Sequence, residues 1–239
     1  MDIITVKAPV PEKDFVREPR HVIQSAVISV DDDPAAQQFD QHAFIASAIF
    51  EASRLHLDIP GEFVNVFPGD HYRLLAALIK LFQPQLMVDI GTFTGLSARV
   101  MGAYSSSTAE VVTFDVVPYN EIPGTVLDTQ ICTALTIDQY IQDLSDPAVF
   151  EANKELLQKA DFIMCDGPKD GQFEPKFIQL LANLEFPVKK RWMLMDDIRF
   201  VEMAGLWRAI QSPKIDLTSF GHFSGTGLVD ISNGLILKA

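Results

Sequence analysis

The sequence predicts a doubly wound α/β fold with a mostly parallel, seven-stranded sheet that ends in an antiparallel hairpin. Two observations lead to this prediction. Short apolar runs alternate with helix-compatible stretches in the middle of the chain, as in a parallel sheet covered by helices on both faces. The C-terminal part instead has two strand-like runs, Leu217–Phe223 and Leu228–Ser232, on either side of the turn 224–227, which is typical of an antiparallel hairpin.

Five apolar runs are the candidates for the parallel strands. The runs are Gln85–Ile90, Glu110–Val116, Gln139–Gln142, Asp161–Cys165 and Trp192–Met195. Helix-compatible stretches separate them, and right-handed crossovers then determine how the chain winds. A length of 239 residues suits one large α/β domain of this kind.

The first part of the chain differs from the rest. We expect residues 1–68 to form an N-terminal arm and helix, and residues 69–239 to form the sheet domain. Prolines interrupt the arm, whereas apolar residues three and four apart predict an amphipathic helix over 35–57. A second helix is predicted over 70–82, with Asp70 as its N-cap. We expect the N-terminal addition to be a lid over an acceptor pocket or the contact of a homodimer.

Composition excludes several classes of partner. The chain has 32 acidic and 19 basic residues and a formal net charge of −13, so it repels phosphate backbones and anionic lipid surfaces. We therefore expect no nucleic-acid and no membrane partner, and interpret the basic run 189–191 as the solvated start of a strand. Without a signal peptide or an apolar span, a cytoplasmic protein is expected. Cys132 and Cys165 lack the spacing of a zinc or redox site and are expected to be buried.

A glycine turn follows the first predicted strand. The segment reads Asp89-Ile90-Gly91-Thr92-Phe93-Thr94-Gly95-Leu96-Ser97-Ala98. Glycines at such a turn let the backbone approach a ligand between a strand end and a helix N-terminus. The Gly-x-x-x-Gly spacing differs from the Gly-x-Gly-x-x-Gly pattern that packs a pyrophosphate. An acid just before the turn would also repel a pyrophosphate, but it suits the ammonium and sulfonium groups of S-adenosylmethionine (SAM). The turn therefore favours SAM over NAD.

Acids at the ends of the next two predicted strands extend this site. Asp115 ends the second strand, where its carboxylate can accept two hydrogen bonds from ribose hydroxyls. Asp143 ends the third strand and is expected to border the adenine. Either residue alone could be a helix cap or a turn residue. Together with the glycine turn, the ordered set predicts a nucleoside cofactor.

The segment 89–98 resembles the cofactor motif of the catechol and caffeoyl-CoA type O-methyltransferases, which reads acid-x-Gly-x-x-x-Gly-x-Ser. The resemblance covers residues 70–232 and implies the Rossmann-like sheet of the class I SAM-dependent methyltransferases. It also implies that Ser97 holds the methionine carboxylate, with help from the helix N-terminus. The implied cofactor-binding residues are Asp89, Gly91, Thr92, Phe93, Gly95, Ser97, Asp115 and Asp143.

Three more carboxylates, Asp166 and the pair Asp196-Asp197, follow the fourth and fifth predicted strands. Neighbouring parallel strands would bring them to one edge of the sheet, where they must be protonated, neutralised by a cation or turned apart. A divalent ion such as Mg²⁺ is the economical solution, since it takes oxygen ligands. The same O-methyltransferases have metal-ligating acids at these places, and the macrocin-type sugar O-methyltransferases resemble this chain more closely in having Asp-Asp there. The resemblance implies that all three aspartates ligate a metal.

Lys169 follows Asp166 in an Asp-x-x-Lys pattern, which resembles the family signature with lysine as the general base. A metal beside an ammonium lowers its pKa and makes a neutral amine accessible. The implied reaction is in-line transfer of a methyl group from SAM to a small-molecule hydroxyl, with Lys169 and Asp166 as catalytic residues and Asp170 as the reserve base. Lys169 could instead be a solvated loop residue, and His222 is interpreted as structural.

Other functions stay open on the sequence alone. A metal-independent methyltransferase acting on nitrogen or a carboxylate would use the aspartates to recognise an amine. A SAM-fold module could bind the cofactor without turnover, and an NAD-dependent oxidoreductase is disfavoured by the glycine spacing. No residue pattern says whether the acceptor is a sugar, a phenol or a larger metabolite.

Overall fold

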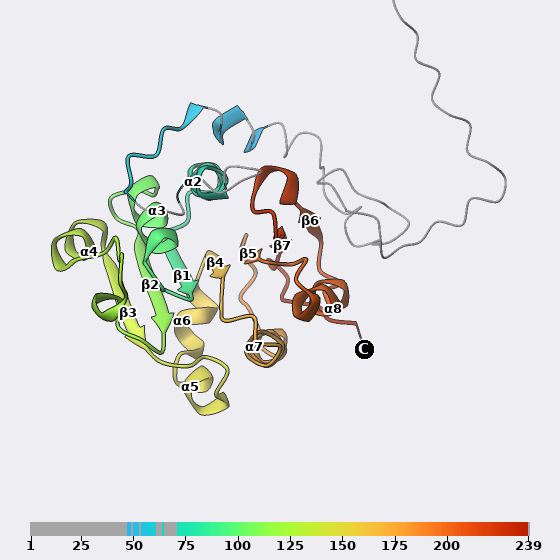
Figure 1. Cartoon of the computed structure of the whole chain (residues 1–239). Helices are drawn as coiled ribbons and strands as arrows, with labels where there is room; N and C mark the ends of the chain where they lie inside the picture. The colour runs from blue at the N-terminus through green and yellow to red at the C-terminus, as the bar shows by residue number, and fades with distance from the viewer. Residues whose placement is uncertain (1–46, 49, 53, 61–63, 65–70, 239) are drawn as a thin grey trace, which may run out of the picture.

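One seven-stranded sheet forms the centre of the molecule, in the order β3-β2-β1-β4-β5-β7-β6 (Figure 1). The computed structural model describes residues 47–48, 50–52, 54–60, 64 and 71–238. The strands are β1 (Leu86–Ile90), β2 (Glu110–Asp115), β3 (Ile137–Ile141), β4 (Phe162–Cys165), β5 (Trp192–Asp196), β6 (Lys214–Asp216) and β7 (Thr226–Asp230). The first five are parallel, and β7 is antiparallel to both β5 and β6. The predicted mostly parallel, seven-stranded sheet with an antiparallel C-terminal pair is confirmed.

Helices cover both faces of this sheet (Figure 1). They are α2 (His71–Phe82), α3 (Leu96–Tyr104), α4 (Thr129–Leu135), α5 (Pro147–Ala152), α6 (Lys154–Lys159), α7 (Phe173–Ala182) and α8 (Val201–Ala209), with the 3-10 turns η3 (Tyr119–Glu121) and η4 (Thr218–Phe220). Alternate strand residues enter two apolar clusters, as the two-residue period of a strand requires. Met87 of β1 packs in the cluster under α2 and α3, whereas Val88 packs in the cluster under α5 to α8.

The C-terminal strand pair is displaced from its predicted position. The predicted first strand, Leu217–Phe223, instead contains η4 and a loop, and β6 ends before it. The Asp216 carboxylate accepts hydrogen bonds from the backbone N–H and the hydroxyl of Thr218, at 2.9 and 2.5 Å. These bonds turn the chain out of the strand, and the second half of the predicted turn 224–227 is the start of β7.

Other boundaries also differ from the predictions. β3 begins and ends earlier than predicted, because it is an edge strand with only Ile137 fully buried and therefore has a weak apolar pattern. The helix predicted over 70–82 is α2, while its predicted N-cap lies outside the described residues. Most of the helix predicted over 35–57 also lies outside them. Its described helical residues end at Arg54, and Phe50, expected on the apolar face, is 63% exposed.

The basic run 189–191 is not uniformly solvated, and Cys132 is only partly buried. Arg191 is 1% exposed, which contradicts the interpretation of this run as a solvated strand start. Its guanidinium donates hydrogen bonds to the carbonyl oxygens of Gln158, Ala160 and Pro187 at 2.6 to 3.0 Å. The residue therefore ties the end of α6 to the loop before β5. None of the helices in the described part of the chain has the length and apolar character of a membrane span.

Replacing Arg191 with methionine tests this tie. Arg191→Met leaves three backbone carbonyls without their charged donor, so we expect the free energy of unfolding to fall by about 2–4 kcal/mol. The neighbouring Lys190 is exposed and pairs with Asp230 at the surface. Lys190→Met should therefore cost no more than about 1 kcal/mol in the same urea titration. Equal losses in the two variants would refute the role given to Arg191.

Candidate active site

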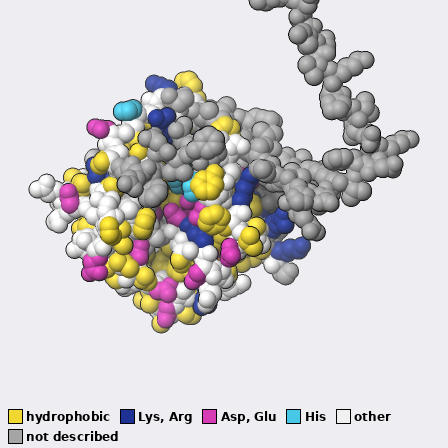
Figure 2. All heavy atoms as spheres, in the orientation of Figure 1, with side chains coloured by type: hydrophobic (Ala, Val, Ile, Leu, Met, Phe, Trp, Pro, Cys, Tyr) yellow, Lys and Arg dark blue, Asp and Glu magenta, His cyan; other side chains and the backbone are white. Residues whose placement is uncertain are grey.

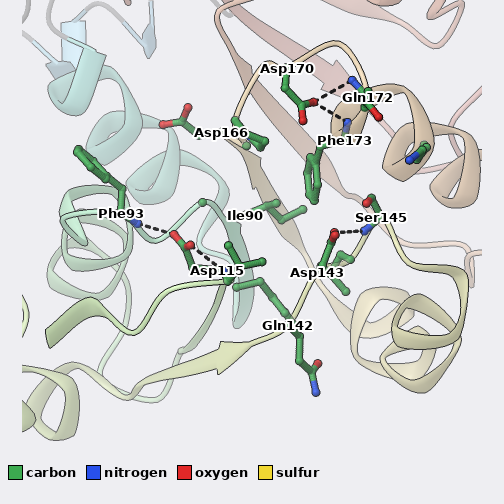
Figure 3. A pocket seen from close by; sticks show the side chains of 17 residues that line it. Ile90, Phe93, Asp115, Gln142, Asp143, Ser145, Asp166, Asp170, Gln172 and Phe173 are labelled. Atoms are coloured by element: carbon green, nitrogen blue, oxygen red, sulfur yellow. Dashed lines mark hydrogen bonds between the residues drawn. The ribbon is translucent and has the colours of Figure 1, made fainter. Parts of the chain in front are cut away.

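A cavity of about 610 Å³ opens at the carboxyl ends of β1, β2, β3 and β4. Its size is that of a small-molecule site, and it lies where the strand order reverses between β1 and β4. Apolar walls come from Ile90, Phe114 and Phe173. Of the residues predicted to form the site, the cavity is lined by Gly91, Phe93, Asp115, Asp143 and Asp166 (Figure 3).

Gly91 has no room for a side chain. Its φ is +96°, and a Cβ atom there would lie 1.9 Å from the carbonyl oxygen of Asp166. The loop after β1 therefore touches the loop after β4, and only glycine permits this contact. Gly95 is similarly constrained, since its Cβ would overlap Leu127 at 2.3 Å. Both glycines are required by backbone geometry.

Asp115 is already engaged by the backbone (Figure 3). One carboxylate oxygen accepts a hydrogen bond from Phe93 N at 2.9 Å, and the other accepts from the N–H groups of Val116 and Val117. A carboxylate has about four acceptor positions, so little capacity is left for two ribose hydroxyls. Asp115 therefore holds the glycine turn in place, and its predicted role as a ribose ligand requires one of these bonds to give way. Asp143 forms a turn by accepting from Ser145 N at 2.8 Å.

Four of the predicted cofactor residues do not line this cavity: Asp89, Thr92, Gly95 and Ser97. The side chain of Asp89 points to the α3 face, because strand alternation directs its neighbour Ile90 to the cavity. It accepts hydrogen bonds from the hydroxyls of Ser97 at 3.0 Å and Thr113 at 2.9 Å. Ser97 thus donates a hydrogen bond to Asp89 and supports the turn from the α3 side. Burial raises the pKa of Asp89 to about 7.

Lys169 connects two of the predicted metal-ligating carboxylates. Its ammonium pairs with Asp166 and lies 3.1 Å from an Asp197 oxygen. Only 9% of its side chain is exposed, so the alternative of a solvated loop lysine is wrong. Burial acts to lower the pKa of Lys169, but the charges of Asp166 and Asp197 outweigh burial and raise the pKa above its ordinary value. In this arrangement, the lysine holds a proton instead of accepting one.

Glu174 positions this lysine. Glu174 is fully buried in α7, and its Oε1 accepts a hydrogen bond from Lys169 N at 2.9 Å. Lys169 has a left-handed φ of +52°, so the carboxylate stabilises an otherwise unfavourable backbone conformation. Asp170, the predicted reserve base, accepts from the N–H groups of Gln172 and Phe173 and faces the start of α7 (Figure 3).

Two histidines lie beside Asp196 and Asp197 at the end of β5. His222 Nδ1 lies 3.6 Å from Asp196 Oδ1 and 3.4 Å from Asp197 Oδ1. From α2, the Nδ1 atom of His71 lies 3.8 Å from Asp196 Oδ1. In the space-filling view, histidine and acidic side chains gather near the middle of the visible face (Figure 2). The interpretation of His222 as merely structural therefore overlooked an ionic cluster, and His71 was missed altogether.

The cluster has a definite charge balance. Burial acts to lower the pKa of His222, but Asp196 and Asp197 raise it to about 9. Hydrogen bonds from His222 and Ser224 and the charge of Lys169 overcome burial and lower the pKa of Asp197 to about 2. The carboxylates predicted to repel one another therefore face an ammonium and an imidazolium. Cations of the chain itself supply part of the neutralisation for which a metal was invoked.

Comparison with known proteins finds similarity in structure only. No protein-family model and no curated protein sequence matches the chain. The structure is similar to a methyltransferase from Geobacter sulfurreducens, with 14% identity over 82% of this chain and 90% of that chain and a TM-score of 0.49. It is also similar to the SAH-bound methyltransferase PaMTH1 from Podospora anserina, with 14% identity, coverage of 83% and 88% and a TM-score of 0.46.

A further similar structure is the O-methyltransferase TomG from Streptomyces achromogenes in complex with SAM. The identity is 14%, the coverage is 87% of this chain and 98% of that chain, and the TM-score is 0.46. Likeness at this level concerns the fold. What the chain does must therefore be inferred from its own residues.

The buried carboxyl of Asp89 predicts a pH-dependent stability. Its pKa is raised from 3.8 to about 7, so between these values the folded state binds the proton more tightly than the unfolded state. The free energy of unfolding should therefore fall as pH rises from about 4 to 7 and lose this dependence above it. Asp89→Asn keeps an acceptor for Ser97 and Thr113 but cannot ionise. Urea unfolding at pH 5 and pH 8 should show a larger loss in the wild type than in the variant, and parallel pH profiles would contradict the assignment.

Proposed function

We propose that the chain is a SAM-dependent methyltransferase that transfers a methyl group to a hydroxyl of a small molecule, assisted by a divalent cation. One observation carries the proposal. Asp166 lines the cavity and also pairs with the buried Lys169, so a nucleoside-sized cavity meets a proton-holding cluster at one residue. A methyl donor in the cavity would have its reacting end beside a group able to manage the proton of the acceptor.

The cavity suits an adenosine carrying positive charge. Asp115 and Asp143 border it at the ends of β2 and β3, while Ile90, Phe114 and Phe173 offer apolar surface for a base. Acidic groups favour the sulfonium and ammonium of SAM and disfavour a pyrophosphate. The methionine part would lie towards Gly91 and Asp166.

The residues after β5 fit a divalent cation. Ligand atoms of Asp196, Asp197 and His222 lie within 4.8 Å of one another. Asp196 Oδ1 is buried, and no described residue gives it a hydrogen bond. Its positive neighbours, the imidazoles of His222 and His71, lie at 3.6 and 3.8 Å, so a directly bound cation would satisfy this oxygen better. Asp196 and Asp197 would hold the cation, with Asp166 as the third ligand implied by the family resemblance.

Methyl transfer to a hydroxyl requires a base that accepts the hydroxyl proton, and Lys169 is the candidate for this base. The acceptor oxygen forms a bond to the methyl carbon as the carbon–sulfur bond breaks, and the hydroxyl proton must leave to a base. A bound divalent cation would acidify the acceptor hydroxyl and offset the charge of the aspartates. With less negative charge around it, the pKa of Lys169 falls and its neutral amine can accept the proton. The backbone contact from Glu174 keeps the amine in place for this step.

One observation favours the metal-independent alternative. Lys169 and His222 already place positive charge against the aspartates, so methylation of nitrogen or a carboxylate without a cation is the second candidate. Treatment with EDTA separates the two. Loss of activity that Mg²⁺ or Mn²⁺ restores supports the first proposal, and full activity after chelation supports the second.

SAM binding is the first test of the proposal. Calorimetry should show binding of SAM and S-adenosylhomocysteine to the wild type, and no comparable binding of NADH. Gly91→Ala forces a Cβ atom into the Asp166 carbonyl and should lower SAM affinity at least about tenfold. Gly205→Ala is the matched control, since a Cβ atom there meets nothing within 4 Å. Thermal melting checks that both variants fold. NADH binding without SAM binding in the wild type would overturn the proposal.

Lys169 provides the test of turnover. Lys169→Met removes the proton acceptor and should slow S-adenosylhomocysteine formation by about 10²–10⁴-fold in a panel of hydroxyl acceptors. SAM affinity should stay within about threefold, because the lysine does not line the cavity. The exposed Lys154, paired with Glu151 in α5, is the control for loss of a lysine charge. A wild type that binds SAM but methylates no acceptor would be a binding module instead.

A further inference from the structure

We propose that His222, in place of Asp166, completes the divalent-cation site with Asp196 and Asp197, and that the site consequently prefers Mn²⁺ and Co²⁺ to Mg²⁺. The inference rests on the cation assistance within the proposed function. It concerns binding alone and can be tested without turnover.

Asp166 is the least suitable of the predicted ligands. One of its oxygens pairs with the Lys169 ammonium, and 28% of its side chain is exposed. An ion on this carboxylate would lie beside a buried ammonium, and two cations at such short range repel each other. Asp166 also lies outside the group of three residues whose ligand atoms converge within 4.8 Å. We therefore infer that Asp166 pairs with Lys169 and lines the cavity, and that it does not bind the ion.

The two carboxylate oxygens of Asp197 have different partners. Its Oδ2 lies 3.1 Å from Lys169 Nζ, whereas its Oδ1 lies 3.4 Å from His222 Nδ1. The residue has a left-handed φ of +59°, which aspartate adopts more readily than most residues, and its carboxylate lies between the two cationic groups. The Oδ1 atom also accepts a hydrogen bond from Ser224 Oγ, so an ion on the His222 side would share this oxygen with Ser224 without displacing the lysine.

Two of the three donor separations are close to those of an octahedral ion, and all three donor atoms lie within 4.8 Å of one another. Ligands about 2.1 Å from an ion and at right angles to each other lie about 3.0 Å apart. Distances of 3.6 and 3.4 Å from His222 Nδ1 to Asp196 Oδ1 and Asp197 Oδ1 therefore need only a small contraction. Ser224 Oγ lies 2.5 Å from the same nitrogen and donates to Asp197, so an ion would also have to displace this hydroxyl from Nδ1. Ion binding would replace the proton on Nδ1 and release it to solvent.

Asp196 supplies the independent indication of a ligand. The residue is 6% exposed, and its Oδ1 accepts no hydrogen bond from the described part of the chain. Two imidazoles lie near this atom, with His222 Nδ1 at 3.6 Å and His71 Nδ1 at 3.8 Å. These contacts are longer than a hydrogen bond, and an ion shared with His222 would bind the buried oxygen directly.

The nitrogen donor determines the choice of metal. Mg²⁺ prefers carboxylate, carbonyl and water oxygens, Mn²⁺ largely shares this preference, and imidazole suits the later transition metals, with affinities that rise from Mn²⁺ to Co²⁺. A site with two carboxylates and one imidazole should therefore bind more tightly along the series Mg²⁺, Mn²⁺, Co²⁺. A site made of three aspartates would lack this nitrogen-based preference for Co²⁺.

Metal titration of the whole chain tests the proposal. Protein stripped with EDTA and desalted is titrated with Mn²⁺, and the free ion is followed by electron paramagnetic resonance, with Mg²⁺ as competitor. We expect His222→Gln to lower Mn²⁺ affinity at least about tenfold and to leave Mg²⁺ affinity nearly unchanged. Asp166→Asn should change Mn²⁺ affinity by no more than about threefold, since only a longer-range charge is lost. His56→Gln, a change at an exposed histidine, is the matched control.

A second measurement reports the ligand directly. The visible absorption of bound Co²⁺ should change in His222→Gln and stay the same in Asp166→Asn, while circular dichroism checks that both variants fold. Loss of binding in Asp166→Asn but not in His222→Gln would overturn the proposal, as would a wild type that binds no Mn²⁺. SAM calorimetry on the same samples keeps the two proposals apart. Failure to bind SAM removes the methyltransferase function, and the metal result stands or falls separately.

Discussion

The contact between Gly91 and the carbonyl of Asp166 is the constraint on which the rest of the site depends. The turn after β1 is fastened to both neighbouring strands, because Gly91 N donates to Phe114 O at 2.9 Å and Asp166 N donates to Ile90 O at 2.8 Å. If these two loops lay further apart, the loop that carries Lys169 would be separated from the cavity. Asp115 on one side and Glu174 on the other then fix the two loops through backbone N–H groups. The carboxylates of Asp115 and Glu174 thus hold the backbone of the two loops in position.

Electrostatics gives the second constraint. In a chain of net charge −13, several carboxylates are gathered within a poorly solvated region. Lys169 and His222 offset this charge, and the aspartates in turn keep the Lys169 ammonium protonated. Proton acceptance by Lys169 therefore requires a change of charge nearby, on substrate or cation binding. The same aspartates that position the lysine also restrain its basicity until the site is filled.

Strand order made the central part of the site predictable from sequence. Asp115, Asp143 and Asp166 each follow a parallel strand, so the topology alone brings them to one edge. The direction of the Asp89 side chain could also be predicted from the sequence, since alternation with Ile90 turns it away from the cavity. The family resemblance instead placed Asp89 and Ser97 in the cofactor site. His71 and His222 come from segments far apart in the chain, and no local pattern joins them. The prediction for Arg191 was wrong, because a run of basic residues does not show which of them is buried against backbone carbonyls.

The sheet assigns the two halves of the proposed reaction to opposite faces. Ile90 and Phe114 belong to the apolar cluster under α5 to α8, and both line the cavity. Alternation along β5 places Leu194, and next Asp196, on the α2 face, where His71 meets it. In the proposed function, the donor and acceptor would therefore approach from different sides and meet at the carboxyl edge, near the contact between Gly91 and Asp166. Cofactor binding would then depend on the β1 to β4 loops and acceptor choice on α2 and the loop before β7, so the two properties could change independently.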